Sequence, residues 1–355
     1  MKPVLARQWI ALIALACALS LTGCGGGASD DNSPAPDVPD IPGQPTVPAK
    51  PIVNMADTVL AEPIKVGARP FGIAITPNGK FAYVLNFNDT SVSVIATATN
   101  TVTKTIPLPF GEVSDMAISP NGNYVYVTDD DSSALDVIDT ASNTVTKVIS
   151  GLDSAFSVAV APGGNSVYVA TCGTQSVSVI STATYAVTAT IHDASQLCIR
   201  SMAITPNGKY VYGVDAGAVS VIDTASNTVA VAAIAVGKLP AAVAITPDGK
   251  FAYVANYSDG TVSVIDTASH QVTSTLNVGA GTQYVAITPD GKYAYVANDN
   301  DGTVSVIDTA SHQVVNTLDV GAAPAGIAIT PDGKFVYVTN MDDNTVSVIA
   351  RSSGG

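Results

Sequence analysis

Short apolar stretches separated by polar turns occupy most of this chain. Near its end, residues 326–330 and 335–338 are apolar, and the turn Pro331-Asp332-Gly333 joins them; Pro presets φ for such a turn and Gly supplies a positive φ. A third apolar run covers 345–349, and the preceding period adds a fourth at 314–320. The runs are rich in Val, Ile and Tyr, are bounded by Pro or Gly, and lack an i, i+3, i+4 pattern. They therefore predict β-strands and not helices.

This unit occurs seven times. Successive copies of its proline are 41 to 44 residues apart: Pro77, Pro120, Pro162, Pro206, Pro247, Pro289 and Pro331. Four short strands in a period of this length are typical of one blade of a β-propeller. The strands are apolar on both faces, as expected of sheets that are covered on both sides. The sequence predicts an all-β fold over residues 57–355: a seven-bladed β-propeller of four-stranded antiparallel blades.

The seventh repeat ends after its third strand, at Ala350. Its missing fourth strand has a counterpart before the first repeat, because residues 59–67 align with residues 314–321. We expect this N-terminal strand to complete the last blade. Such sharing closes the ring and removes the exposed sheet edges that an open array would carry.

Three second strands end in closely related motifs, Tyr337-Val338-Thr339-Asn340 and the near copies at 253–256 and 295–298. These motifs resemble the signature of the YVTN-family β-propeller repeat proteins, and the resemblance covers roughly residues 58–350. It implies the propeller fold. Propellers similar to this one include bacterial envelope proteins, archaeal surface-layer proteins, lactonases and domains of redox enzymes, so the resemblance implies no single activity.

The first 23 residues have the features of a signal peptide. Lys2 and Arg7 precede an apolar run at 9–21 that is too short to span a membrane. Leu21-Thr22-Gly23-Cys24 resembles a bacterial lipobox, which implies cleavage before Cys24 and a lipid anchor on that residue. An ordinary signal peptide is the alternative. Gly25 occupies the position at which Asp would retain a lipoprotein at the inner membrane, so we expect an envelope protein anchored in the outer membrane.

Residues 24–56 are rich in Gly, Asp, Ser and Pro and predict a disordered tether between the anchor and the propeller. Without Lys2 and Arg7 the chain has 13 basic and 29 acidic residues, a formal charge of −16. This charge opposes binding to nucleic acid or to anionic lipid headgroups. It also keeps an apolar-rich protein soluble. We expect a monomer whose contact with the membrane is the N-terminal lipid.

The loops after the second and fourth strands vary between repeats and are the better candidates for function. The residue nine positions after each repeat proline is Asn or Asp in all repeats but one: Asn86, Asp129, Thr171, Asp215, Asn256, Asn298 and Asn340. Such residues commonly cap strand ends through Asx turns. The alternative is an acidic rim for cations or a basic partner.

A second set of candidates interrupts the repeat at the entry to the first strands. Large or charged residues replace small ones there: Arg69, Glu112, Asp115, Arg200, Gln283 and Tyr284. We expect them, together with Asp129 and Asp215, to surround the axial opening as a ligand-binding site of mixed charge. The alternative is an ordinary solvated rim.

Other chemistry is not indicated. The three histidines, His192, His270 and His312, do not form a zinc or copper motif, and His270 and His312 occupy equivalent surface turns. The sequence contains no Cys-x-x-Cys-His for c-type haem and no Gly-x-Ser-x-Gly. We therefore predict no metal site, no cofactor and no catalytic residue, and favour a non-enzymatic role.

The sequence favours a binding or scaffolding module for a protein or a small ligand. One alternative is a lactonase-like propeller hydrolase with an axial metal held by Glu112 and Asp115. Another is a surface-display or adhesion protein, which the long tether would suit.

We also predict a disulfide between Cys172 and Cys198. The first follows the second strand of the third repeat, and the second lies in the connection to the fourth repeat, so both loops emerge on one face. The cell envelope is oxidising, and adjacent loop tips can meet the Cα separation that a disulfide requires. Two free thiols are the alternative.

Overall fold

The computed structural model describes residues 57–109, 111–192, 198–215 and 217–352. The chain divides into two compact units, 1–52 and 53–355, and all described residues belong to the second. The predicted signal peptide, Cys24 and the tether therefore lie outside the described residues. The described part of the chain contains no helix that is long and apolar enough to cross a membrane.

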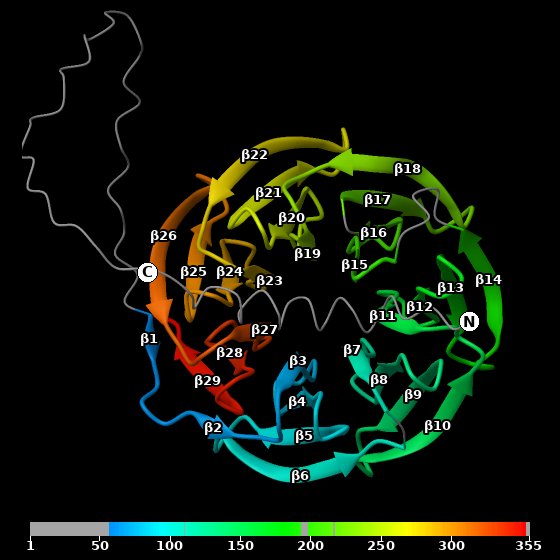
Figure 1. The fold of residues 1–355 in the computed structure, drawn as a ribbon, viewed down its shortest axis with the longest axis horizontal. Coiled ribbons are helices and arrows are strands. Elements are labelled where there is room, and N and C mark those ends of the chain that lie inside the picture. Colours follow the sequence, from blue (N-terminus) through cyan, green and yellow to red (C-terminus); the bar gives the residue numbers. More distant parts are fainter. Residues whose placement is uncertain (1–56, 110, 193–197, 216, 353–355) are drawn as a thin grey trace, which may run out of the picture. The chain divides into compact units, whose positions relative to one another are not determined.

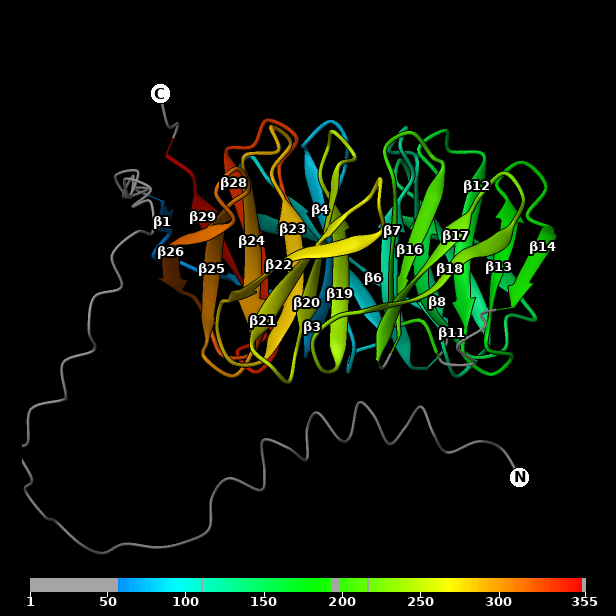
Figure 2. The same ribbon diagram turned by 90° about the horizontal axis from the view of Figure 1, so that it is seen from above.

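Seven antiparallel sheets are arranged around one axis (Figures 1 and 2). The innermost strands are β3 (Pro70–Ile75), β7 (Val113–Ile118), β11 (Ala155–Val160), β15 (Ser201–Ile204), β19 (Pro240–Ile245), β23 (Thr282–Ile287) and β27 (Pro324–Ile329). The second strands are β4 (Phe81–Asn86), β8 (Tyr124–Asp129), β12 (Ser166–Thr171), β16 (Tyr210–Val214), β20 (Phe251–Asn256), β24 (Tyr293–Asn298) and β28 (Phe335–Asn340).

The third strands are β5 (Ser91–Ala96), β9 (Ala134–Asp139), β13 (Ser176–Ser181), β17 (Ala218–Asp223), β21 (Thr261–Asp266), β25 (Thr303–Asp308) and β29 (Thr345–Ala350). The outermost strands are β6 (Thr101–Pro107), β10 (Thr144–Ser150), β14 (Val187–His192), β18 (Thr228–Ala235), β22 (Gln271–Asn277) and β26 (Gln313–Asp319). Blades 1 to 6 are these consecutive sets of four strands, starting at β3. Blade 7 consists of β27, β28 and β29 with β1 (Thr58–Val59) and β2 (Ile64–Lys65). The predicted seven-bladed, all-β fold is confirmed.

The core lies between neighbouring blades. One face of blade 1 contributes Tyr83, Leu85 and Val92 to a cluster that also holds Val113 and Val127 of blade 2, and all five are fully buried. Similar clusters fill the other junctions between blades. Because each sheet packs on a neighbour on both sides, the second and third strands are mostly apolar on both faces, as the sequence pattern indicates.

Blade 7 is closed by the N-terminal segment, as predicted. Thr58 pairs with Ala350 and Ile64 pairs with Val346, so both β1 and β2 lie along β29. The predicted single strand is divided into two short ones around residues 60–63. Pro63 lies just before β2 and has no backbone N–H to donate to a ladder, so pairing stops there and resumes at Ile64.

Buried tyrosines of five second strands bind the next blade. Tyr83 Oη donates to Asn143 Oδ1 at 2.6 Å, and Tyr253 Oη lies 2.9 Å from His312 Nδ1. Tyr212 contacts His270 Nδ1 in the same way at 2.8 Å. The two histidines are thus half-buried partners of tyrosines and not merely surface turn residues.

The same contact is rebuilt from different residues where the chain ends meet. Tyr295 faces blade 7, whose third strand is followed by the C-terminus and not by another turn. Here Tyr295 Oη donates to Asp57 Oδ2 at 2.5 Å, and Arg351 Nε donates to Tyr295 Oη at 3.1 Å. Asp57 Oδ1 also accepts the Ser352 N–H at 2.9 Å. The closing seam therefore has a polar contact between both ends of the propeller in addition to its strand pairing.

Candidate functional site

The residue at the end of each second strand is buried, and in four blades it is an asparagine that binds the third strand. In blade 6, Asn298 Nδ2 donates to Thr303 Oγ1 at 3.0 Å and to Ser305 Oγ at 2.9 Å. Ser305 Oγ in turn donates to the Val278 carbonyl at 3.0 Å. The equivalent asparagines make the same pair of contacts: Asn86, Asn256 and Asn340. Their role is to hold two strands together, so they do not form an exposed rim.

Asp129 and Asp215 occupy this same buried position, at 0% and 1% exposure. Asp129 Oδ1 accepts the Ser132 N–H at 3.0 Å, and Asp215 Oδ1 accepts the N–H groups of Gly217 and Ala218. Our prediction that they line the axial opening is wrong. The position nine after the proline ends the second strand from the axis, and its side chain is enclosed between sheets.

The innermost strands are irregular near their first residues in most blades. The register shifts between Val113 and Met116 in β7 and between Thr282 and Tyr284 in β23, and six of the seven innermost strands carry such a shift. A bulge bends a strand and re-aims a side chain. Asp115, Gln283 and Tyr284 therefore lie in or beside the irregular segments nearest the axis.

Asp115 connects blade 2 to blade 3 while keeping a carboxylate near the axis. Its Oδ2 accepts from Ser157 Oγ at 2.9 Å and from the Val158 N–H at 3.0 Å, and its Oδ1 accepts the Met116 N–H at 2.8 Å. Protein surrounds the group, although part of its surface is accessible to solvent. Burial raises the pKa of Asp115 to about 6, and these three hydrogen bonds oppose the rise. The group is mostly ionised at neutral pH.

The contact between blades does not by itself require a charge. In blade 4 the equivalent residue is Ser201, whose Oγ accepts the Val243 N–H at 3.3 Å. In blades 1 and 7 the equivalent residues are Gly72 and Gly326, which have no side chain. Blades 1, 4 and 7 therefore pack against their neighbours without a carboxylate at this position.

The charge of Asp115 acts on Tyr284, which lies on the innermost strand of another blade. Burial raises the pKa of Tyr284, and the negative charge of Asp115 raises it further. Their strands, β23 in blade 6 and β7 in blade 2, lie on different sides of the axis (Figure 1). Next to Tyr284, Gln283 is 8% exposed and its Oε1 accepts no hydrogen bond within the described residues. The carboxylate of Asp115, the phenol of Tyr284 and the amide oxygen of Gln283 thus all come from innermost strands of the propeller.

The other three predicted site residues, Arg69, Glu112 and Arg200, each come directly before an innermost strand. Burial lowers the pKa of Arg200 and the charge of Asp215 opposes that change, so Arg200 lies near Asp215. Burial raises the pKa of Asp299, and the charge of Arg69 counteracts part of the rise. The Glu112 carbonyl accepts the Asp130 N–H at 2.9 Å. Asp115, Gln283 and Tyr284 lie within innermost strands, and we take these three as the candidate axial group.

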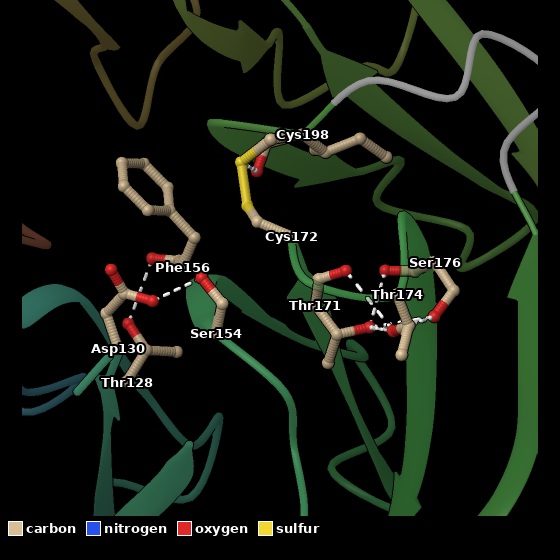
Figure 3. The surroundings of a disulfide bond; sticks show 10 residues. Thr128, Asp130, Ser154, Phe156, Thr171, Cys172, Thr174, Ser176 and Cys198 are labelled. Carbon is tan, nitrogen blue, oxygen red and sulfur yellow. Dashed lines mark hydrogen bonds between the residues drawn. A yellow bond between two sulfur atoms is a disulfide. The ribbon is translucent and has the colours of Figure 1, made fainter. Parts of the chain in front are cut away.

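A disulfide joins Cys172 and Cys198, with 4.6 Å between their Cα atoms (Figure 3). It links the loop after β12 in blade 3 to the segment that leads into β15 in blade 4. Beside it, the Cys172 N–H donates to the Ser154 carbonyl at 2.9 Å, and Ser154 Oγ donates to Asp130 Oδ1. The disulfide thus joins blades 3 and 4, and the contact of Ser154 with Asp130 joins blades 3 and 2, whereas the Cys172–Ser154 backbone contact lies within blade 3 and recurs in other blades.

A surface groove of about 620 Å³ lies between the loops of blades 5 and 6. Its wall includes Tyr257, Asp259 and Gly279. Asp259 Oδ2 accepts the Lys238 N–H at 2.8 Å, a contact that Asp89 and Asp343 repeat at their own blades. Since this carboxylate is used in a recurring structural contact, the groove is a weaker candidate than the axial group.

The described residues contain no group of three or more His, Cys, Asp or Glu that could hold a metal ion. The hydrolase alternative assigned an axial metal to Glu112 and Asp115. Asp115 is directed to Ser157 and Val158 of the neighbouring blade, and no third ligand approaches it within the described part of the chain. The side chains present do not fit such a metal.

Sequence reasoning missed Asp136, which stands in β9 where the other blades have serine. The fully buried Asp136 lies near Asp129, and both of its carboxyl oxygens lack a hydrogen-bond partner in the described structure. Aligning the third strands would have revealed it, because Ser93, Ser263 and Ser305 occupy the equivalent position.

Two family models match parts of the chain. Residues 266–355 match a model described as lactonase, 7-bladed beta-propeller, and residues 163–280 match the cytochrome D1 heme domain. No curated protein matches the chain. Among solved structures, hydrazine synthase of Kuenenia stuttgartiensis is similar, with a TM-score of 0.73, 24% identity, and coverage of 80% of this chain and 96% of that chain. In total, 1787 chains of solved structures match this chain. Because one fold can carry many functions, the fold alone does not indicate an activity. The matches and the ring support a β-propeller family.

The haem-domain match prompts a test of the histidines within it. His270 is engaged by Tyr212 Oη and packs edge-on against Tyr210, with ring centroids 5.3 Å apart. His192 is exposed at the end of the outermost strand β14. Neither lies on an innermost strand, so neither belongs to the candidate axial group.

Proposed function

We propose that this protein is a lipid-anchored binding module of the bacterial cell envelope whose ligand is a small organic cation. Asp115, Tyr284 and Gln283 would receive the ligand near the propeller axis. The observation that carries the proposal is the carboxylate of Asp115, which is enclosed by protein and influences the phenol of Tyr284 from the other side of the ring. Blades with serine or glycine at the same position pack without that charge.

The chemistry of the three groups supports a cation. An ionised Asp115 attracts positive charge, Gln283 Oε1 offers an acceptor without a partner among the described residues, and the Tyr284 ring offers a π-face. The whole chain has a formal charge of −14, which favours the approach of cations over anions. An amine or quaternary ammonium group fits this combination better than a carboxylate or phosphate does.

The proposed attachment rests on the sequence before residue 57. Lipid on Cys24 would hold the propeller at the outer membrane, and residues 24–56 would provide the spacing. Replacing Cys24 with Ala should move the protein from the membrane fraction to a soluble fraction with its thermal stability unchanged. Retention with membranes after this change would contradict the lipid anchor.

Ligand binding can be measured by isothermal titration calorimetry with spermidine, putrescine and choline as probes. We expect at least one probe to bind the wild type, and Asp115→Asn to weaken its binding about tenfold, the effect of losing ~1.4 kcal/mol of charge interaction. Asp319→Asn is the matched control, since Asp319 is exposed on the outermost strand β26. Equal affinities for wild type and Asp115→Asn, or no binding of any probe, would contradict the proposal.

Affinity for the probe should rise with pH through about 6. Asp115 loses its proton there, and only the carboxylate attracts the cation. Asp115→Asn should abolish this dependence, whereas Tyr284→Phe should weaken binding and leave the dependence in place.

The lactonase match at residues 266–355 favours hydrolysis of a small ester as a second candidate. Incubation with a chromogenic lactone, with and without added Ca²⁺ or Mn²⁺, tests it. Turnover that Asp115→Asn abolishes would support the hydrolase and displace the binding module.

A further inference from the structure

Two buried carboxyl groups are diagonal neighbours on one face of blade 2. Asp129 pairs with Ala134 across β8 and β9, and Val127 pairs with Asp136. Partners across antiparallel strands point to one face, and residues two apart share that face, so Asp129 and Asp136 lie on the same side of the sheet. Both are 0% exposed.

Their oxygens lack the hydrogen bonds that buried carboxyls need. Asp129 Oδ1 accepts the Ser132 N–H, but Asp129 Oδ2 and both oxygens of Asp136 have no partner within the described residues. The face that carries them packs against blade 1 through apolar side chains that include Leu85 and Val92. Two ionised carboxylates in such a place would repel each other and lose their hydration.

Blade 6 shows what this position needs. There a chain of donors runs from Asn298 to Ser305 and on to the Val278 carbonyl, and every group in it is neutral. Substituting Asp for both Asn and Ser removes all of these donors. One proton restores a donor to the pair, because a protonated carboxyl can donate to a neighbouring carboxylate.

We propose that Asp129 and Asp136 share one proton in the folded protein, and that this pair makes the propeller more stable at mildly acidic pH than at neutral pH. The two groups then act as one buried proton-binding site. The inference depends on blade 2 alone and does not rest on the proposed ligand.

Other charged groups facing this side of blade 2 are directed elsewhere. From β4, Tyr83 contacts Asn143, and from β6, Lys104 Nζ donates to the Ser142 carbonyl at 3.1 Å; both partners belong to the turn at the other end of the blade. On β7, Asp115 is directed to blade 3.

Several acidic residues belong to the neighbouring loops, and one of them, Asp131, raises the pKa of Asp130 through its charge in addition to the larger effect of burial. Asp130 accepts from Ser154 of blade 3, and Glu112 lies in the segment that leads into β7. Burial raises the pKa of Asp136 to about 7, and the charge of Asp129 makes a smaller contribution in the same direction. No cation contributes to that pKa.

A metal ion is the other positive species that could join two carboxylates. Calcium requires about six to eight oxygen ligands, and magnesium about six. Three free carboxyl oxygens lie here, one oxygen of Asp129 is already used, and the described residues provide no third carboxylate, His or Cys. A proton needs two oxygens, so the geometry favours the proton.

The direction of the pH effect follows from the raised pKa. Asp136 has an ordinary value of 3.8 in the unfolded chain and about 7 in the folded protein, so the folded state binds more protons between these values. The bound proton stabilises the folded state fully below about pH 4, and this stabilisation is lost as pH rises toward 7. Above pH 7 it changes no further. The raised pKa of Asp115 changes the stability in the same direction up to about pH 6. Its contribution is present in wild type and variant alike, so comparing the two removes it.

The test compares urea unfolding of wild type and Asp129→Asn/Asp136→Ser between pH 4 and 8. The double variant restores the pair that blades 1, 5, 6 and 7 contain. The ratio of the wild-type to the variant unfolding constant should increase about tenfold per pH unit between pH 4 and 7, the slope for one proton. A pH-independent ratio would contradict the proposal.

A reciprocal variant in blade 1, Asn86→Asp/Ser93→Asp, should add the same dependence to the wild type. If either variant does not fold, carboxyl ¹³C NMR of the wild type still decides, since one of the two groups should be protonated at pH 6. Two carboxylates at pH 6 would overturn the shared proton. Stabilisation by Ca²⁺ or loss of stability in EDTA, present in the wild type and absent from the double variant, would replace it with a metal site.

Discussion

The ring consists of a regular arc and a divergent arc. Blades 5, 6, 7 and 1 form the regular arc, in which an asparagine at the end of the second strand donates to two hydroxyls of the third. Blades 2, 3 and 4 form the divergent arc, where the same position holds Asp129, Thr171 and Asp215. The backbone is nevertheless four-stranded in both arcs. The fold therefore tolerates different polar groups at one position, provided that the apolar pattern persists.

The difference shows which polar groups the fold requires. In the regular arc the asparagines form repeated, neutral contacts that join two strands. The divergent arc adds a carboxyl pair, the enclosed charge of Asp115 and a disulfide. The axial group combines the two arcs, because Asp115 comes from blade 2 and Tyr284 from blade 6. Departures from the repeat are accordingly the places where function is to be sought.

The largest effect should come from opening the regular arc at its seam. A protein that starts at residue 67 loses β1, β2 and Asp57, whereas one that starts at residue 56 keeps them. Loss of buried Ile64 and of the Asp57–Tyr295 contact should cost about 4 kcal/mol or more. Urea unfolding measures it. Equal midpoints for the two proteins would show that the seam does not close the ring.

Removing the disulfide tests the divergent arc. Cys172→Ser/Cys198→Ser should lower the free energy of unfolding by about 3 kcal/mol in the chain-entropy model. A reductant should destabilise the wild type to the same extent and leave the double variant unchanged. Free, alkylatable thiols in protein purified without reductant would contradict the pairing.

A third change compares the two arcs at one position. Asn298→Ala leaves the hydroxyls of Thr303 and Ser305 without their donor and should cost about 1–3 kcal/mol. Asp129→Ala removes a buried carboxyl with an unpartnered oxygen and should cost less at pH 8. Thermal unfolding of both variants at that pH decides. An equal loss would mean that the arcs use the position alike.

The smallest effect concerns the tyrosine contacts between blades. Tyr253→Phe removes one hydrogen bond to His312 and should cost about 1 kcal/mol. His312→Asn should cost less, because Asn100 and Asn143 accept from tyrosines in the same way elsewhere in the ring. Chemical denaturation of both variants at pH 7 checks the order. The reverse order would show that the imidazole matters for more than this bond.

The sequence predicted the architecture because strands, turns and closure each follow from local patterns that repeat seven times. It placed the candidate site only in part. Asp115 and Tyr284 were found as departures from the repeat, but Asp129 and Asp215 were assigned to the axis because loop position alone does not give distance from it. Asp136 was missed because the sequence alone does not show which residue of the neighbouring strand lies beside it, and its nearness to Asp129 is what makes it unusual.

The most direct test of the axial site is the pKa of the Asp115 carboxyl, measured by ¹³C NMR with Asp115→Asn to assign the resonance. We predict a value of about 6 in the free protein, because burial disfavours the charged form. Saturating amounts of the cation that binds in calorimetry should lower it. A value below 4 that the cation does not change would mean that Asp115 only joins two blades, and would contradict the account of this site.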